Sequence, residues 1–260
     1  MRLEVLLSVM NLNKKDLDKM NITSKCTVIN QCGKNKIEKY RKFNIYSYDE
    51  VGVSKSRNRG LDNVNEDIIL TSDNDIIYND RYERMVIDEF KNNREADVII
   101  FNVDNPTRGK RLIKKRKRLY IFNSLNYASC NIAFRRKSIK NNKIRFNTSF
   151  GPGAKFGNGS DTIFLRDVFR NKLKVYSSPC NIGKIYPNES TWFKGYNETY
   201  FFNKGALFTA INPRIRHILI LQYLLRHKEV LVDIKFIKAY KLMLKGSKEY
   251  LYDYRNNKCL

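Results

Sequence analysis

The segment Ile68–Asp75 reads Ile-Ile-Leu-Thr-Ser-Asp-Asn-Asp and joins a short apolar run to two carboxylates one residue apart. An apolar, β-branched run of this length is typical of a strand that is covered on both faces. Ligands in open α/β sheets bind just outside the carboxyl ends of strands. Asp73 and Asp75 therefore predict a ligand site, and their oxygens suit a hard divalent cation. An ordinary Asp-Asn-Asp turn without a metal is the alternative interpretation.

The rest of the first hundred residues repeats this pattern of buried strands. Three more short apolar runs are Val5–Met10, Thr27–Ile29 and Val98–Val103. Helical periodicity separates them at Ser54–Val64 and Asp80–Asn92, and we expect Asp80 to cap the second helix. Alternating strands and helices predict an α/β sandwich.

Composition limits the classes of function. The chain has 260 residues, 42% of them hydrophobic, and a formal net charge of +24. The apolar content predicts a folded protein. The charge predicts attraction to nucleic acid, anionic membranes or nucleotide diphosphates. Five scattered cysteines without CxxC spacing argue against a zinc site or a disulfide framework and favour a reducing cytoplasm.

A second motif lies upstream of the acidic turn. Residues 52–61 read Gly-Val-Ser-Lys-Ser-Arg-Asn-Arg-Gly-Leu, so a glycine precedes a helix start that carries Lys55, Arg57 and Arg59. Helix N-termini and guanidinium groups both favour phosphate. By itself the motif is equally compatible with a solvated basic helix.

Taken together, the order and spacing of these motifs resembles the family 2 glycosyltransferases over roughly residues 3–180. A first strand ends in Asn11 and a second in Asn30-Gln31, followed by Ser-Arg-Asn-Arg-Gly-Leu, Asp73-Asn74-Asp75 and Gly159-Ser160-Asp161. The resemblance implies the GT-A fold, a Rossmann-like nucleotide-binding α/β/α sandwich with a mixed sheet. It also implies inverting, metal-dependent sugar transfer in the assembly of bacterial capsule, exopolysaccharide or lipopolysaccharide.

The resemblance also implies a role for each matched position. Asp73 would contact the donor ribose and the metal, and Asp75 would be the principal carboxylate ligand of Mn²⁺ or Mg²⁺. Asp161 would be the general base that deprotonates the acceptor hydroxyl; stabilisation of a helix dipole is its structural alternative. The implied nucleotide-sugar contacts are Asn11, Asn30, Gln31, Arg57, Asn58 and Asp73.

Departures from the family pattern refine this expectation. Asn30-Gln31-Cys32-Gly33 replaces a common acidic segment, so a UDP-sugar is the expected donor but the base contact differs. Ser160-Asp161 keeps the base of the family's Glu-Asp pair. The Gln-x-x-Arg-Trp element of processive synthases is absent, which predicts one sugar added per encounter. In the loop of residues 186–193, Asn188 or Glu189 could be a third metal ligand, or the loop could be structural.

We expect two domains. Residues 1–210 would form the catalytic domain, with a nucleotide-sugar-binding half (1–103) and an acceptor-binding half (104–210). Residues 211–260 would form a basic amphipathic helical tail, with an apolar face made of Val230, Ile234, Ile237, Tyr240 and Leu244. The run Ile218–Leu225 is far shorter than the roughly 20 apolar residues that cross a bilayer.

The expected partners follow from the resemblance and the charge. They are a nucleotide sugar, a saccharide or lipid-linked acceptor and, through basic residues 110–118 and the tail, an anionic membrane. A merely solvated basic surface is the alternative. We expect a cytoplasmic protein, with peripheral contact at the inner face of the membrane left open. The competing functions are a nucleotidyltransferase and a nucleic-acid-binding protein, although no nucleic-acid-binding signature is recognisable.

Overall fold

The computed structural model describes residues 1–105, 113–121, 131–186 and 195–256, which belong to two compact units. Unit 1 consists of Met1–Val51, Lys55–Phe146 and Phe164–Asn188, and unit 2 of Gly52–Ser54, Asn147–Ile163 and Glu189–Leu260. The strands, all in unit 1, are β1 (Leu3–Met10), β2 (Lys25–Gln31), β3 (Lys36–Tyr40), β4 (Phe43–Tyr48), β5 (Ile68–Asp73), β6 (Ile76–Tyr78), β7 (Val98–Asp104), β8 (Lys117–Leu119), β9 (Ile132–Arg135) and β10 (Val175–Ile185). Unit 1 also contains the helices α1 (Lys14–Lys19), α3 (Tyr82–Asn92) and α5 (Arg136–Asn141).

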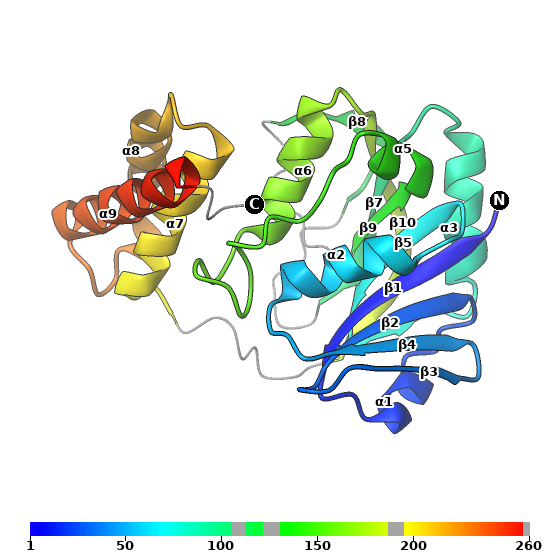
Figure 1. Cartoon of the computed structure of the whole chain (residues 1–260). Helices are drawn as coiled ribbons and strands as arrows, with labels where there is room; N and C mark the ends of the chain where they lie inside the picture. Colours follow the sequence, from blue (N-terminus) through cyan, green and yellow to red (C-terminus); the bar gives the residue numbers. More distant parts are fainter. Residues whose placement is uncertain (106–112, 122–130, 187–194, 257–260) are drawn as a thin grey trace. The chain divides into compact units, whose positions relative to one another are not determined.

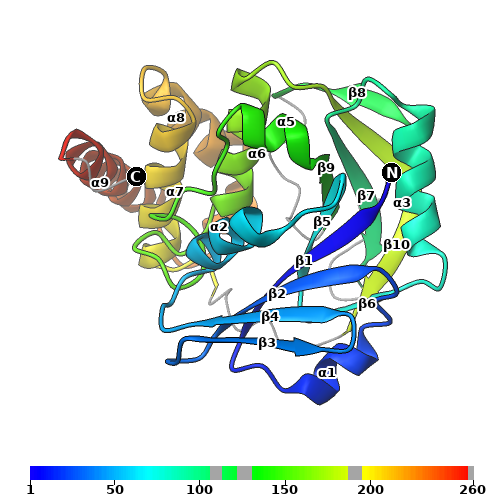
Figure 2. The ribbon, with the colours of Figure 1, turned by 45° about the vertical axis from the view of Figure 1, so that its right-hand side comes forward.

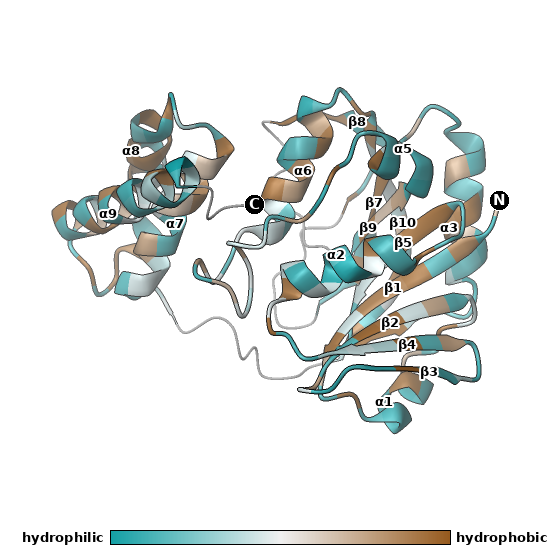
Figure 3. Cartoon of the chain, viewed as in Figure 1, coloured by the Kyte–Doolittle hydropathy of each residue, from teal (hydrophilic) through white to brown (hydrophobic). Residues whose placement is uncertain are grey.

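The described strands form one mixed sheet in the order β3-β4-β2-β1-β5-β9-β7-β10-β6, with β8 paired to β10 (Figure 1, Figure 2). β4, β2, β1 and β5 run parallel to one another, whereas β9 is antiparallel to both β5 and β7. The four predicted buried runs all lie in this sheet, so the predicted α/β class with a mixed sheet is confirmed. β1 is buried from Leu3 to Val9 and is hydrophobic over much of its length in Figure 3.

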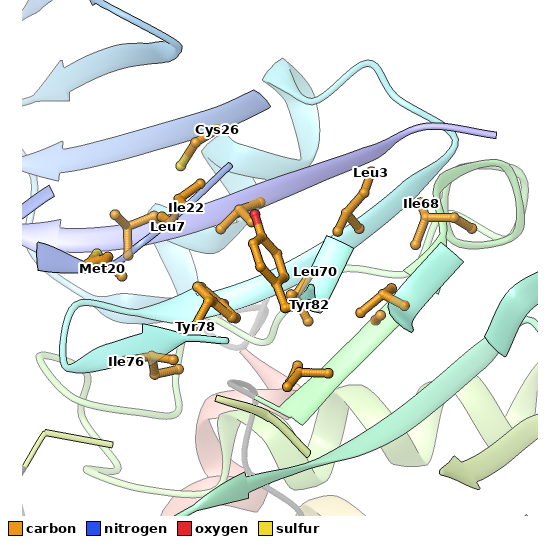
Figure 4. Close-up of a cluster of buried hydrophobic side chains, with 14 of the residues drawn as sticks. Leu3, Leu7, Met20, Ile22, Cys26, Ile68, Leu70, Ile76, Tyr78 and Tyr82 are labelled. Atoms are coloured by element: carbon orange, nitrogen blue, oxygen red, sulfur yellow. The ribbon is translucent and has the colours of Figure 1, made fainter. Parts of the chain in front are cut away.

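Helices cover both faces of the sheet. On one face, α1 and α3 contribute Leu17, Val86 and Phe90 to a core with β1, β2 and β5, part of which is shown in Figure 4. On the other face, α2 (Val53–Asn63), α5 and α6 (Ser160–Arg170) pack on a second core that includes Leu6 and Phe164. Gly60 of α2 is needed here, because an added Cβ would lie 2.6 Å from Leu6. The result is a three-layer α/β/α arrangement.

The predicted cap of α3 is wrong. The helix begins at Tyr82 with Arg81 as its N-cap, and this position makes no side-chain capping bond. The carboxylate of Asp80 instead accepts a hydrogen bond from the Asn21 side chain at 2.9 Å. A tertiary contact has therefore taken the oxygen that a local capping pattern would use.

Unit 2 contains the helices α7 (Glu198–Ile211), α8 (Arg216–Arg226) and α9 (Phe236–Arg255) and the short 3₁₀ helix η2 (Lys228–Val230). Gly205 of α7 and Gly246 of α9 let these helices touch, since an added Cβ on either would lie 1.9 Å from a carbonyl oxygen of the other helix. Among the described residues, no helix is both long and apolar enough to cross a membrane.

The predicted apolar face of the tail is wrong in part. Val230 and Ile234 precede α9, although both are buried, and Ile237 is 69% exposed. The buried positions of α9 are instead Ala239, Met243, Gly246, Ser247, Tyr250 and Asp253. Contact with α7 favours small residues, which a hydrophobicity pattern does not detect. The expected division into a catalytic domain, with its donor-binding and acceptor-binding halves, and a tail depends on ligands and stays a prediction. By packing alone, α7 belongs to the same unit as α8 and α9.

Candidate functional site at the carboxyl edge of the sheet

The parallel strands of unit 1 end at one edge of the sheet, where most of the predicted residues lie. Asn11 follows β1 with φ 52°, a left-handed conformation that asparagine tolerates better than most residues. Its N–H donates to the Gln31 carbonyl at 3.0 Å, which extends the β1–β2 pairing by one residue. Gln31, the last residue of β2, is buried.

Asn30 links three segments at this edge. Its Oδ1 accepts the N–H of Leu12 at 2.9 Å, and its Nδ2 donates to Ser47 Oγ at 3.1 Å. The side chain is buried and thereby fixes the loop after β1 against the end of β4. The nucleotide contacts expected of Asn11, Asn30 and Gln31 stay predictions.

Arg57 and Asp73 are brought into direct contact. The Arg57 side chain is only 5% exposed, and its Nη2 donates to Asp73 Oδ1 at 2.9 Å. The guanidinium carbon also lies 5.4 Å from the centre of the Phe146 ring. Arg57 of α2 therefore places a buried positive charge at the acidic end of β5, where the Asp73 side chain is 39% exposed.

The neighbouring Asn58 is engaged with the main chain of Phe146. Its Nδ2 donates to the Phe146 carbonyl at 2.8 Å, and its Oδ1 accepts the Phe146 N–H at 2.8 Å. These two bonds hold residue 146 against α2 and, through it, the ring over which Arg57 lies. A nucleotide contact by Asn58 stays a prediction.

Asp73 and Asp75 flank the turn between β5 and β6. The Asp75 carbonyl accepts the N–H of Tyr186 at 2.7 Å, so the turn is tied to the end of β10. Burial, and secondly the negative charge of Asp73, raise the pKa of the Asp75 carboxyl above its usual value. The two carboxylates thus repel one another at a partly buried position.

This pair fits a divalent cation. A cation would relieve the repulsion, and Mg²⁺ is commonly held by one or two carboxylates together with substrate phosphates and water. Among the described residues there is no cluster of three or more metal-ligating His, Cys, Asp or Glu side chains, so metal binding by Asp73 and Asp75 stays a prediction. Asn188 and Glu189 lie outside the described residues.

Asp161 belongs to unit 2, where it stands in the first turn of α6. The preceding backbone is fixed within that unit. Gly159 has φ 102°, and a Cβ there would lie 2.6 Å from Leu207. Ser160 Oγ is 2.7 Å from Ser54 Oγ, which also donates to the Phe150 carbonyl at 2.7 Å. The proximity of Asp161 to the carboxylate pair of unit 1 stays a prediction.

Ser8 was missed by the sequence analysis. It lies on β1 opposite Asp73 in the β1–β5 register, and it is 8% exposed. Among the described residues, its hydroxyl has no hydrogen-bond partner. A serine inside the apolar run Leu3–Met10 was the available signal, because a buried hydroxyl without a partner is costly unless a ligand or water satisfies it.

Two surface hollows of unit 1 lie elsewhere. They have volumes of about 610 and 420 Å³ and share Arg136 and Lys140 as lining residues. Their walls come from α5 and its neighbours, including Asp67 before β5 and Arg135 at the end of the antiparallel β9. The two hollows therefore lie away from the carboxyl edge, and neither is lined by a predicted site residue. The candidate site is accordingly defined by the residues at the carboxyl edge.

Residues 28–171, more than half of the chain, match the family described as glycosyl transferase family 2. No curated protein matches the chain.

Among solved structures, S. aureus TarS 1–349 has a TM-score of 0.64 at 13% identity, covering 99% of this chain and 92% of that one. The same protein in complex with UDP-GlcNAc has a TM-score of 0.65 at 14% identity, with the same coverage. The mannosyltransferase PcManGT from Pyrobaculum calidifontis, in complex with GDP-Man and Mn²⁺, has a TM-score of 0.56 at 9% identity, covering 97% of this chain and 87% of that one. At these identities the likenesses carry the fold alone, and they confirm the predicted one.

Proposed function

Because the chain belongs to glycosyl transferase family 2, we propose that it moves one sugar from a UDP-sugar to a saccharide or lipid-linked saccharide acceptor, with inversion. The observation that carries the proposal is the contact of Arg57 with Asp73 beside Asp75, at the carboxyl edge of the sheet. A buried cation and two carboxylates at that edge suit a diphosphate with its divalent metal.

The leaving group explains this combination of charges. When the bond between the anomeric carbon and the diphosphate oxygen breaks, the departing nucleoside diphosphate gains negative charge. Mn²⁺ or Mg²⁺, bound by Asp73 and Asp75, would neutralise part of that charge. Arg57 supplies a second positive charge, already oriented by Asp73 and by the ring of Phe146.

Asp161 would act on the acceptor. As the acceptor oxygen forms its bond to the anomeric carbon, the hydroxyl proton passes to the Asp161 carboxylate. A single displacement of this kind inverts the configuration at the anomeric carbon. The fixed backbone around Ser160 suits such a role, because a general base must hold its position.

The donor class is supported by likeness to the solved structures. TarS is described in complex with UDP-GlcNAc and PcManGT with GDP-Man and Mn²⁺, which favours a nucleotide sugar with a metal for this chain. We place the reaction in bacterial cell-surface polysaccharide synthesis, in the cytoplasm at the inner face of the membrane. A lipid-linked acceptor would bring the enzyme there.

A thermal-shift screen tests the donor and the metal. We expect one UDP-sugar to raise Tm only when Mn²⁺ or Mg²⁺ is present. In the Asp75→Asn variant we expect the metal-induced thermal shift to be lost. Asp80→Asn is the matched control, since Asp80 is an exposed carboxylate bonded to Asn21 in the same unit. Absence of stabilisation by every nucleotide sugar, with and without metal, would contradict the proposal.

Product analysis separates the competing functions. Glycosyl transfer releases a nucleoside diphosphate, whereas a nucleotidyltransferase releases pyrophosphate. Nucleic-acid binding would instead produce a gel shift at physiological ionic strength that weakens as salt is added.

A further inference from the structure

α8 has apolar side chains on two neighbouring faces. Ile220 and Leu224 are fully buried in a cluster with residues of α7, η2 and α9. On the neighbouring face Ile218, Leu221 and Leu225 are 66%, 45% and 55% exposed. Their spacing of three and four residues aligns them along one side of the helix, and we call these three residues the α8 stripe.

The charges on α8 itself have one sign. The helix reads Arg-His-Ile-Leu-Ile-Leu-Gln-Tyr-Leu-Leu-Arg and contains no acidic residue. Arg214, Arg226 and Lys228 flank the stripe and are exposed, whereas the carboxylate that follows them, Glu229, lies 2.7 Å from His227 Nδ1. An exposed apolar stripe bordered by cations is the pattern of helices that lie in the interface of anionic membranes.

We propose that α8 docks on an anionic bilayer, with the α8 stripe inserted among the lipids and the flanking cations at the headgroups. The proposal rests on the proposed function for its purpose, since a lipid-linked acceptor lies at a membrane. At 1.5 Å per residue the helix is about 16 Å long, about half the thickness of a hydrocarbon core, so it lies along the surface.

A second copy of the chain fits the α8 stripe less well. In a two-fold contact the same patch meets itself, so Arg226 and Lys228 of one copy would face cations of the other. Like charges at an interface oppose association; α8 itself has no carboxylate, and that of Glu229 beyond it is already bonded to His227. Anionic lipid supplies the missing negative charge.

The surfaces that the sequence suggested for membrane contact are less well suited. In the basic run, residues 110–112 lie outside the described part of the chain, and Arg116 is paired with Glu89 through its Nε at 3.1 Å. In α9, Lys238 pairs with Glu198 at 2.5 Å. α8 combines exposed apolar area with exposed cations, and interfacial binding needs both.

Co-sedimentation of the full chain with vesicles of phosphatidylcholine and phosphatidylglycerol tests the proposal. The triple variant Ile218→Gln, Leu221→Gln, Leu225→Gln should reduce the partition coefficient at least about tenfold, because it removes the inserted area. Ile37→Gln is the matched control: Ile37 is 77% exposed on β3 of unit 1, and its replacement should change nothing. Undiminished binding by the triple variant would overturn the proposal.

Two further measurements keep the result interpretable. Arg226→Gln with Lys228→Gln should weaken binding to anionic vesicles even if the triple variant fails to fold, and unchanged binding would again overturn the proposal. Sedimentation equilibrium should show the same oligomeric state for wild type and triple variant; a dimer lost in the triple variant would assign the stripe to a second copy. Donor-induced thermal shifts should persist in the triple variant, and their absence in the wild type would count against the proposed function alone.

Discussion

The carboxyl edge of the sheet in unit 1 and the α7–α9 crossing in unit 2 both hold like groups close together. At the edge the groups are the carboxylates of Asp73 and Asp75, and burial with mutual repulsion raises the pKa of Asp75. At the crossing they are two helix backbones, which approach because Gly205 and Gly246 have no side chain.

The energetic consequences are opposite. The helix crossing pairs polar groups internally: Thr209 Oγ1 donates to the Gly205 carbonyl at 2.9 Å and lies within hydrogen-bond distance of Ser247 Oγ, at 2.7 Å. The acidic turn keeps two carboxylates together, and in the proposed function a divalent cation would neutralise them. Close packing without a polar cost is typical of a structural contact, whereas carboxylates that repel one another are a reason to propose a binding site.

The largest expected effect is on stability, at the contact between α7 and α9. Gly205→Leu places a branched side chain where even a Cβ would lie 1.9 Å from the Met243 carbonyl oxygen. We expect it to destabilise the chain by more than about 4 kcal/mol, as severe overpacking does. Urea unfolding monitored by circular dichroism measures this. Gly195→Leu is a milder control, since nothing lies within 4 Å of a Cβ there, although its φ of 84° is unfavourable for leucine.

The second largest effect is expected at Asp161, through which unit 2 would contribute the general base. Asp161→Asn should lower kcat by roughly 10²–10⁴-fold, the usual effect of losing a general base. If Asp161 only stabilises the dipole of α6, the change should instead cost about 0.3–1 kcal/mol of stability and leave kcat intact. Steady-state kinetics with a thermal melt distinguishes the two. Asp167→Asn, a substitution on the same helix, should leave kcat unchanged.

Neutralising the acidic turn should separate stability from activity. Without metal, Asp75→Asn should raise Tm by about 1–3 °C, because it removes a partly buried charge that Asp73 repels. The same variant should lose sugar transfer and the metal-induced thermal shift. A lower Tm in the absence of metal would show that the protein already stabilises the Asp75 carboxylate. The difference that we describe between the acidic turn and the contact of α7 with α9 would then be contradicted.

The sequence predicted the centre of the fold better than its margins. β1, β2, β5 and β7 each contain a short, mostly apolar run, and such runs can be recognised without tertiary information. β10 was missed because Pro179 and polar residues interrupt it, and its pairing with β7 shifts register at Asn181. α7 was missed because Gly205 weakens a helical pattern that only its contact with α9 explains.

The candidate site divides in the same way. Spacing along the chain placed Asp73 and Asp75 after a strand, and the structure puts them at the carboxyl edge of β5. Arg57 and Asp73 are 16 positions apart and lie on different elements, so no local sequence pattern predicts their contact. Ser8 became a candidate only when the register set it opposite Asp73.

The smallest predicted effect concerns Asn58, which the resemblance assigns to the nucleotide and whose side chain holds Phe146. Asn58→Ala leaves the N–H and carbonyl of Phe146 without their side-chain partners, so we expect a loss of about 1–3 kcal/mol in urea unfolding. Asn63→Ala, which removes one exposed bond to the Arg59 carbonyl at the end of the same helix, should cost less than half as much. Donor affinity decides between the two roles. If Asn58 acts by holding the Phe146 ring under Arg57, lowering the temperature to restore folding should restore donor binding; if it contacts the nucleotide, the affinity stays low in the fully folded variant.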